Sequence, residues 1–445
     1  MKKVYFCDDS CDISHSYIND IYYNDFERSS LEEADIVIYV GCAYEKTSIE
    51  KSVESLKNII ANMRRNAKLG VFGCITKYDE FYNSFKDRKE IDYIGRGTGL
   101  EMQNEIKNYL NSNKVTVDTA EMGFYLTSPR RLNIIVQDGC NNRCAFCKSN
   151  YLDLHLSSRP MDRILSLVKD FHNAFGIDEI NITGLNPSQY GNDLADGTNL
   201  TTLIKKISSL GYIKTIFLDM LCISDITDEL LMEIVSNPII KRVMVPVQSF
   251  DNRLLKLMGR KNDAMRAFKI IDTINKERPD IFLETILLAT YPTENIENIR
   301  LNIGLLNSFN INNPVVSFYT YGKNVPTLKS ENINDVTYDE IEELRACYCK
   351  YLMPIIERQR KELLSRPVLG RLINRDEQFD YYSTLYRFMA MEYVIRCPRD
   401  DNNQMYEYYE LSTDMLPSSK EYFNCVEIQN GNGKVLKRSS DKNNV

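Results

Sequence analysis

The sequence predicts an α/β protein with three parts: an N-terminal parallel-sheet domain, a partial βα barrel of six strands, and a C-terminal extension that is mainly helical or irregular. Two observations carry this prediction. Up to about residue 330, short apolar runs alternate with amphipathic helices at the spacing of βα units. Beyond that point a long helical pattern begins and the alternation stops. The predicted domains are therefore residues 1–125, 126–330 and 331–445.

In the first domain, three predicted strands are each followed closely by a cysteine: residues 4–6, 36–40 and 69–72. Parallel strands place their carboxyl ends on one edge of a sheet, where ligand sites form. We therefore expect Cys7, Cys42 and Cys74 to converge and to hold an iron–sulfur cluster. Cys11 is an alternative to Cys7, although it lies beyond the predicted strand end.

The second domain repeats the alternation, with six predicted parallel strands at residues 133–136, 179–183, 215–219, 243–247, 281–289 and 315–319. In barrels of this kind the chemistry lies on the loops that follow the strands. The second of these loops holds Gly184, which allows a close backbone approach to a ligand. The fourth holds Gln248 and Ser249, two polar groups expected at the barrel mouth.

The first barrel loop carries the most informative motif, CxxxCxxC, formed by Cys140, Cys144 and Cys147 with Phe146 before the last cysteine. Three thiolates can hold three irons of a 4Fe–4S cluster and leave the fourth open. S-adenosylmethionine (SAM) can bind that iron, and an electron from the cluster can cleave it to a 5′-deoxyadenosyl radical. A zinc knuckle or a buried thiol trio is the alternative, but zinc usually needs a fourth ligand and no partner pair follows.

The remaining composition restricts partners and compartment. The net charge of −7 argues mildly against a broad nucleic-acid surface. No stretch approaches the roughly 20 apolar residues of a membrane span, so we expect a cytoplasmic protein with reduced cysteines. In the third domain, residues 335–364 predict a long helix, residues 381–409 are rich in tyrosine, and a polar tail follows from Ser439.

Across roughly residues 1–327 the chain resembles the radical-SAM methylthiotransferases. The motifs that carry the resemblance are Gly41-Cys42, Gly73-Cys74, Gly139-Cys140-Asn141-Asn142, Phe146-Cys147, Ser158-Arg159-Pro160, Thr183-Gly184-Leu185-Asn186, Gln248-Ser249 and Met258-Gly259-Arg260. They occur in the family's order across two domains.

The resemblance implies two 4Fe–4S clusters and SAM. Cys140, Cys144 and Cys147 would hold the radical-forming cluster, and the N-terminal trio would hold the cluster that donates sulfur. The implied SAM contacts are Phe146, Thr183, Gly184, Asn186 and Gln248. The implied reaction converts an unactivated C–H to C–SCH3 on a macromolecule, with electrons from a donor such as flavodoxin or ferredoxin.

The chain departs from the family at two places, and the second of them, together with the acidic net charge and the tyrosine-rich stretch, bears on the substrate. Residues 290–295 read Thr-Tyr-Pro-Thr-Glu-Asn where Gly-Phe-Pro-Gly-Glu-Thr is usual, and residues from 331 onward do not predict the family's small C-terminal β-barrel, called TRAM. We therefore favour a peptide or protein substrate. The alternatives are a tRNA adenosine methylthiotransferase, a peptide-modifying enzyme of other chemistry such as thioether crosslinking, and a non-catalytic iron–sulfur electron carrier. The sequence does not predict an oligomeric state.

Overall fold

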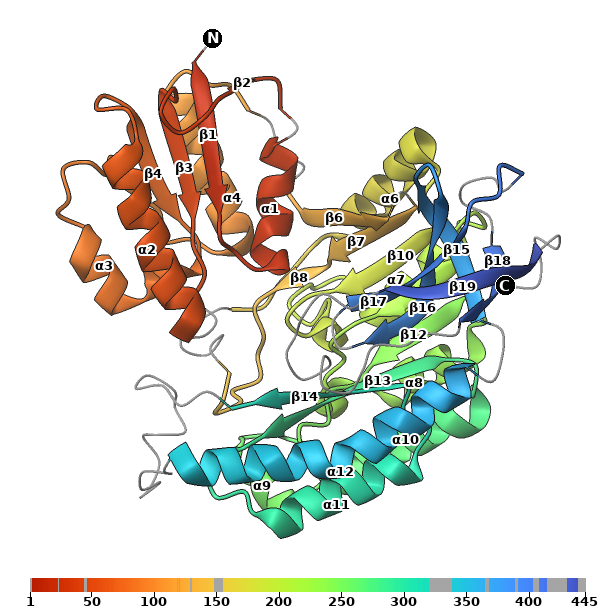
Figure 1. Ribbon diagram of the computed structural model, residues 1–445. Coiled ribbons are helices and arrows are strands. Elements are labelled where there is room, and N and C mark those ends of the chain that lie inside the picture. Colours follow the sequence, from red (N-terminus) through yellow and green to blue (C-terminus); the bar gives the residue numbers. More distant parts are fainter. Residues whose placement is uncertain are drawn as a thin grey trace.

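The structure, a computed structural model, describes residues 2–22, 24–43, 46–117, 119, 121–128, 130–147, 155–319, 338–364, 368–388, 391–402, 408–413 and 430–438. Figure 1 shows an N-terminal α/β domain, a larger sheet with its helices, and a C-terminal helix and barrel. None of the described helices is long and apolar enough to cross a membrane. The predicted polar tail from Ser439 lies outside the described residues.

The N-terminal sheet is entirely parallel, with strand order β2-β1-β3-β4-β5. Its strands are β1 (Lys3–Asp8), β2 (Glu27–Arg28), β3 (Ile36–Val40), β4 (Lys68–Phe72) and β5 (Tyr93–Ile94). Its helices are α1 (Asp12–Tyr22), α2 (Lys46–Asn62), η1 (Cys74–Lys77), α3 (Asp79–Phe85) and α4 (Gly99–Ser112). One face packs against α1 and α4, and the other against α2 and α3. In such doubly wound sheets ligands bind where the strand order reverses, here between β1 and β3.

The second sheet has the order β14-β13-β12-β11-β10-β7-β6, and the six strands from β7 to β14 are parallel, as predicted. They are β7 (Arg131–Ile135), β10 (Glu179–Thr183), β11 (Thr215–Leu218), β12 (Ile240–Met244), β13 (Phe282–Ala289) and β14 (Asn313–Phe318). β6 (Gly123–Ser128) adds an antiparallel edge and spans the predicted boundary between residues 125 and 126. A short ribbon, β8 (Gln137–Asp138) with β9 (Ser157–Ser158), flanks the cysteine loop.

Helices on the outer face cover this sheet, because their apolar sides complete one large core. They are α6 (Met161–Phe175), α7 (Leu200–Ser208), α8 (Asp228–Ser236), α9 (Asn252–Leu257), α10 (Ala264–Glu277) and α11 (Ile296–Ser308), with η2 (Pro187–Gln189) and η3 (Ile223–Asp225) in the loops. The predicted C-terminal helix is confirmed as α12 (Tyr338–Leu364), which lies along α11 (Figure 1). Its predicted apolar face packs into the same core through Tyr348, Leu352 and Ile355.

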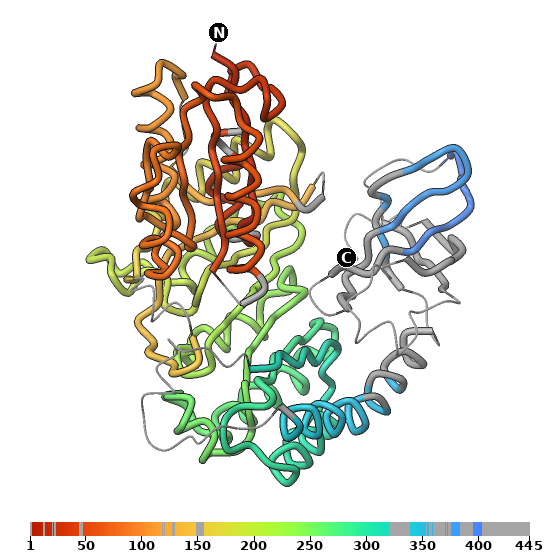
Figure 2. Tube along the Cα trace, turned by 60° about the vertical axis from the view of Figure 1, so that its left-hand side comes forward, coloured from red at the N-terminus to blue at the C-terminus, as the bar shows by residue number. Residues whose placement is uncertain are grey.

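Beyond α12 the prediction of a mainly helical or irregular extension is wrong. Strands β15 (Val368–Arg375), β16 (Phe379–Phe388), β17 (Met391–Pro398), β18 (Tyr408–Thr413) and β19 (Asn430–Arg438) form a closed barrel in the order β15-β16-β17-β19-β18. Figure 2 shows the coloured parts of β16 and β17 to one side of the main body, after α12. The barrel occupies the place along the chain where the resembling family usually carries its small β-barrel.

The physical reason for this error is the composition of the strands. Their inward positions mix apolar and polar side chains, so that Leu372, Tyr382, Ile395 and Cys397 are fully buried beside the carboxylate Asp380. Tyrosine favours strands but weakens the simple alternation of apolar and polar residues on which the prediction relied. Closure also depends on a parallel pairing between β17 and β19, which are distant in sequence.

Candidate active site

The loop with Cys140, Cys144 and Cys147 follows β7 and β8 at the carboxyl end of the large sheet. Gly139 begins it with a φ of +65°, and a Cβ there would lie 1.7 Å from the backbone oxygen of His155. Only glycine fits this position without moving the chain. The loop conformation before Cys140 is therefore determined by one residue.

One side of this cysteine loop rests on the segment after α9. The Ala145 N–H donates to the Met258 carbonyl at 2.9 Å, and Arg260 Nη1 lies 3.7 Å from Cys144 Sγ. Phe146 packs against the small apolar cluster that contains Met258. Burial raises the pKa of Cys144 to about 11, and the Arg260 guanidinium opposes this increase. A cation beside this sulfur thus compensates the charge that a thiolate would carry.

The other side of the loop meets a set of side-chain amides. The Asn142 backbone N–H lies 3.4 Å from Cys140 Sγ, and Asn186 Nδ2 lies 3.7 Å from the same sulfur. The Oδ2 atom of Asp225 accepts hydrogen bonds from both asparagine side chains, at 2.6 and 2.7 Å. Burial raises the pKa of Cys140, and the two N–H contacts lower it.

A fourth thiol, Cys222, borders this site. It follows β11 and is buried, with its Sγ atom 3.3 Å from Asn142 Nδ2. Its backbone N–H points at Asn186 Oδ1 at 3.4 Å. The sequence offers no partner for Cys222, because the contact depends on loops after three different strands.

In the N-terminal domain, Cys42 and Cys74 leave the sheet side by side. β3 and β4 pair with Val40 opposite Phe72, so the two cysteines, each two residues further on, reach the same level. Their loops touch, because a Cβ on Gly73, whose φ is +96°, would lie 2.4 Å from the Gly41 carbonyl oxygen. This part of the predicted convergence follows directly from strand register.

The third N-terminal cysteine is less simply placed. Cys7 pairs with Tyr39, three residues before Cys42, which at strand rise is about 10 Å short of the Cys42 level. Its side chain packs with the apolar cluster on the α2 side of the sheet. Cys11 lies beyond the strand, and its Sγ is 3.8 Å from Ser14 Oγ, which is 3.9 Å from Cys74 Sγ. Register and contacts therefore favour Cys11 as the neighbour of Cys74.

A buried triad joins the two cysteine sites. The Tyr17 hydroxyl on α1 donates to one carboxylate oxygen of Asp138, and Arg159 pairs with the other. Arg159 Nη2 also lies 3.4 Å from the Tyr17 oxygen. Asp138 is two residues before Cys140, and Tyr17 is three residues after Ser14. The triad therefore connects α1, beside the N-terminal cysteines, with the loop that carries Cys140, Cys144 and Cys147.

Comparison with known proteins identifies the family. Residues 134–304 match the Radical SAM superfamily. The ribosomal protein uS12 methylthiotransferase RimO of Carboxydothermus hydrogenoformans is 30% identical over 307 residues, which cover 67% of this chain and 69% of that protein. The chain belongs to the radical-SAM methylthiotransferase family.

Other relatives extend the match. The tRNA-2-methylthio-N(6)-dimethylallyladenosine synthase of Thermotoga petrophila is 28% identical over 348 residues, 76% of each chain. RimO of Clostridium tetani is 25% identical over 438 residues, 95% of this chain and 91% of its own. Among solved structures, the radical SAM methyltransferase TsrM of Kitasatospora setae superposes with a TM-score of 0.53 at 12% identity, covering 74% of this chain and 75% of TsrM, which supports the fold alone.

As a member of this family, the protein is an enzyme that inserts sulfur and transfers a methyl group, and it uses a 4Fe–4S cluster and SAM. The donors in the cysteine loop fit that cluster. Cys140, Cys144 and Cys147 would supply three soft sulfur ligands, and N–H groups face the Cys140 sulfur while Arg260 faces that of Cys144. The shortage of a fourth ligand in the motif suits a cluster whose fourth iron binds SAM.

The residues predicted to contact SAM lie around this loop, and their contacts with SAM stay a prediction. Thr183 ends β10 and is buried. The next residue, Gly184, lies so close to Gln137 that a Cβ on Gly184 would be 2.7 Å from the Gln137 Oε1 atom. Gln248 has a φ of +69°, a backbone conformation that residues other than glycine rarely adopt. Such conformations often occur at functional sites. Asn186 touches Cys140 directly, as described above. The sequence motifs described above do not include Asp225 and do not predict its amide contacts.

The atypical loop at residues 290–295 keeps the backbone that glycine would favour. Thr290 and Thr293 have φ values of +55° and +70°. The Glu294 carboxylate accepts the Thr290 N–H at 2.5 Å and the Tyr348 hydroxyl of α12 at 2.6 Å. Burial raises the pKa of Glu294 to about 7. The loop thus anchors the C-terminal helix α12 to the second, seven-stranded sheet.

Proposed function

We propose that this methylthiotransferase modifies a protein or peptide side chain, using two 4Fe–4S clusters and SAM to replace an unactivated C–H by C–SCH3. The observation that carries the substrate class is the match to two enzymes named as ribosomal protein uS12 methylthiotransferases, one at 30% identity and one over 91% of its length. The longer match extends through the C-terminal barrel, the part of the chain least characteristic of radical SAM enzymes in general.

When bound at the radical site, the cluster and SAM would supply radical chemistry for removing a hydrogen atom from the substrate. The chain's own residues hold and orient these groups. Cys140, Cys144 and Cys147 ligate three irons, and Arg260 and Asn186 face the sulfurs of this loop. The SAM contacts proposed from sequence are Phe146, Thr183, Gly184, Asn186 and Gln248, which lie on the loop and on the ends of neighbouring strands.

The second cluster would lie at the β1/β3 edge of the N-terminal sheet and donate sulfur. Cys42 and Cys74 are the first two proposed ligands, supported by their common level and touching loops. For the third, Cys7 is the residue predicted from sequence, and the contacts through Ser14 favour Cys11. The Tyr17–Asp138–Arg159 triad would maintain the separation between the two sites, as sulfur transfer to a substrate radical requires.

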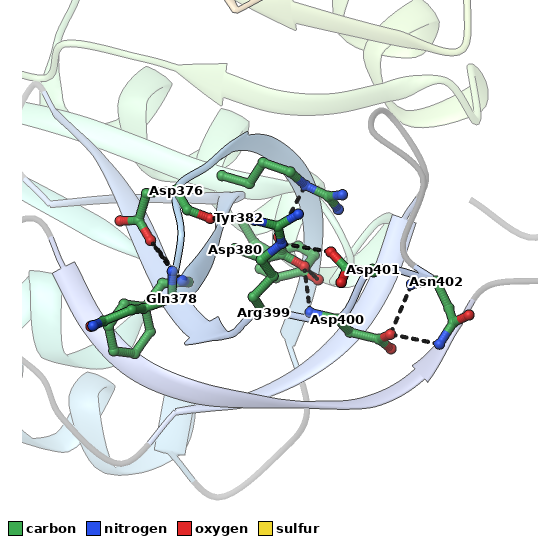
Figure 3. A network of polar contacts seen from close by, with 10 residues as sticks. Asp376, Gln378, Asp380, Tyr382, Arg399, Asp400, Asp401 and Asn402 are labelled. Carbon is green, nitrogen blue, oxygen red and sulfur yellow. Dashed lines mark hydrogen bonds and ion pairs between the residues drawn. The ribbon is translucent and has the colours of Figure 1, made fainter.

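Two ion pairs at one end of the C-terminal barrel argue against phosphate binding at that end, which favours a protein over an RNA substrate. Arg375 pairs with Asp380 at 3.2 Å. Nearby, Arg399 pairs with Asp401 at 2.6 Å (Figure 3). Binding to phosphates gains affinity from cations that displace counterions, and these two guanidinium groups already face carboxylates. The chain as a whole also carries a net charge of −7.

A tRNA substrate is the second candidate, because the Thermotoga petrophila relative is named for tRNA modification and covers 76% of this chain. The barrel itself, which the sequence did not predict, removes one argument against tRNA. Thioether crosslinking and a non-catalytic electron carrier lose support from the family assignment.

The test compares the two candidate substrates in parallel reactions. Anaerobically reconstituted enzyme with SAM and a reductant, either chemical or a flavodoxin- or ferredoxin-type donor, is incubated with ribosomal protein uS12 or with total tRNA. We expect the protein to gain the mass of one methylthio group in place of hydrogen and the tRNA nucleosides to stay unmodified. Methylthiolated nucleosides with unmodified uS12 would reverse the substrate assignment, and loss of two hydrogens from a peptide would indicate crosslinking.

A further inference from the structure

The loop after β11 contributes a carboxylate to the radical site that no motif of the sequence analysis includes. Its turn, η3, is a 3₁₀ turn in which the Asp225 N–H donates to the Cys222 carbonyl at 2.9 Å. Side chains three residues apart in such a turn lie on the same side. Both Cys222 and Asp225 therefore face Asn142 on the cysteine loop, and both accept from its Nδ2 atom.

Asp225 connects three loops through a single oxygen. Its Oδ2 atom accepts from Asn142 at 2.6 Å, from Asn186 at 2.7 Å and from Gln189 at 3.2 Å. These three amides are between 92% and 98% buried, so water cannot easily replace the carboxylate as their acceptor. Because charged acceptors form stronger hydrogen bonds than neutral ones, one carboxylate can orient all three.

Each of these amide residues also touches the cysteine loop. The Asn142 N–H and the Asn186 side chain point at Cys140 Sγ. The Gln189 Oε1 atom accepts the backbone N–H of Asn141 at 2.9 Å. Asp225 therefore acts on the environment of Cys140 through three separate contacts, without touching the sulfur itself.

We propose that Asp225 is a positioning residue of the radical-cluster site, which orients the Asn142 and Asn186 amides toward Cys140 and places a negative charge beside the cluster. Cluster reduction adds an electron, so a nearby negative charge disfavours the reduced state and makes the reduction potential more negative. The inference rests on the radical cluster alone. It is independent of the substrate and of the N-terminal cluster.

The experiment uses the full chain, reconstituted anaerobically, with Asp225→Asn as the principal variant. A redox titration follows the electron paramagnetic resonance signal that changes when SAM is added, which separates the radical cluster from any second cluster. We expect a more positive midpoint potential, a changed response of the signal to SAM, and SAM cleavage slower by about tenfold or more. An unchanged potential together with an unchanged SAM response would overturn the proposal.

Two controls separate charge from position. Asp228→Asn removes a carboxylate three residues away, on an exposed side chain that pairs with Arg266, and we expect no change in potential. Asp225→Glu retains the charge but displaces the oxygen, so the potential should stay near that of the parent while SAM cleavage slows. A shift in Asp228→Asn as large as in Asp225→Asn, or full activity in Asp225→Glu, would contradict the positioning role.

Cys222→Ser tests whether the thiol rather than the carboxylate is responsible. It retains a small polar side chain beside Asn142 and leaves Asp225 in place. Because Asp225 stays in place, we expect shifts in potential and in SAM response that are clearly smaller than those of Asp225→Asn. A shift equal to that of Asp225→Asn would assign the effect to Cys222 and overturn the role of Asp225.

Discussion

The two cysteine sites of this protein are built in opposite ways. In the domain of the seven-stranded sheet, three cysteines come from eight consecutive residues of one loop. That loop is held in place by Gly139, Met258, Arg260 and the amides around Asp225. In the N-terminal domain, the cysteines come from separate strand ends, and their proximity depends on how those strands align. The ligands of a local motif can be read from the sequence. In a site built from separate strands, a register misjudged by a few residues leads to the wrong ligand.

The largest difference between the sites should be seen when each loses a cysteine. We expect Cys144→Ala to abolish SAM cleavage, because the remaining two thiolates cannot hold the radical cluster. Cys42→Ala should leave SAM cleavage largely intact and stop methylthiolation. Separate assays of 5′-deoxyadenosine and of methylthiolated product measure the two effects. Loss of all cleavage in a folded Cys42→Ala protein would mean that the two sites do not function separately.

The choice of third ligand tests the register argument. Because Cys11 shares Ser14 with Cys74 and Cys7 lies short of their level, we expect Cys11→Ala to lose about four of the eight irons expected for two clusters, and Cys7→Ala to retain them. Iron and sulfide analysis after anaerobic reconstitution gives the answer, with each variant as the control for the other. The reverse pattern would restore Cys7, the residue predicted from sequence.

A smaller effect is expected where the two sites meet. Tyr17→Phe removes one hydrogen bond to Asp138 in the buried triad and should lower the free energy of unfolding by about 2 kcal/mol. We also expect more 5′-deoxyadenosine per methylthiolated product, since the two sites would be less firmly positioned. The ratio of the two products measures this uncoupling. An unchanged ratio, with the stability loss present, would limit the triad to a structural role.

The smallest effect should lie at Glu294, in the loop that holds α12. Its pKa of about 7 is above the ordinary value of 4.5, so the native state holds this proton more tightly than the unfolded chain. The resulting stability is complete below about pH 4.5 and is lost as the pH rises through 7. Glu294→Gln should therefore flatten the pH dependence of the unfolding free energy in that window.

The matched control for this last change is Glu297→Gln, an exposed residue on α11 that pairs with Arg300. Denaturant titrations at several pH values compare both variants with the parent. If Glu294→Gln kept the parent's pH dependence, another group would be responsible. Neither variant should change the iron content of the protein.

The sequence by itself determined the α/β class, the six parallel strands and the long C-terminal helix, and it placed the CxxxCxxC motif on the first strand-end loop of the second sheet. Each of these depends on patterns within a short segment: apolar runs at βα spacing, a helical face such as that of Tyr348, Leu352 and Ile355, and a motif of eight residues. Such patterns reflect local propensity and burial, which a single chain segment already specifies. The domain boundaries at residues 125 and 330 stay predictions, although β6 begins at residue 123 and pairs with the second sheet.

Tertiary structure alone decided the remaining features. The five-stranded barrel closes through pairings between distant strands with mixed inward side chains, the neighbour of Cys74 depends on the register of β1 against β3, and the role of Asp225 depends on loops after three strands. In each case the decisive contact joins residues far apart along the chain. The free energy of such contacts depends on packing and strand alignment in the folded state, and local sequence patterns do not report either of these.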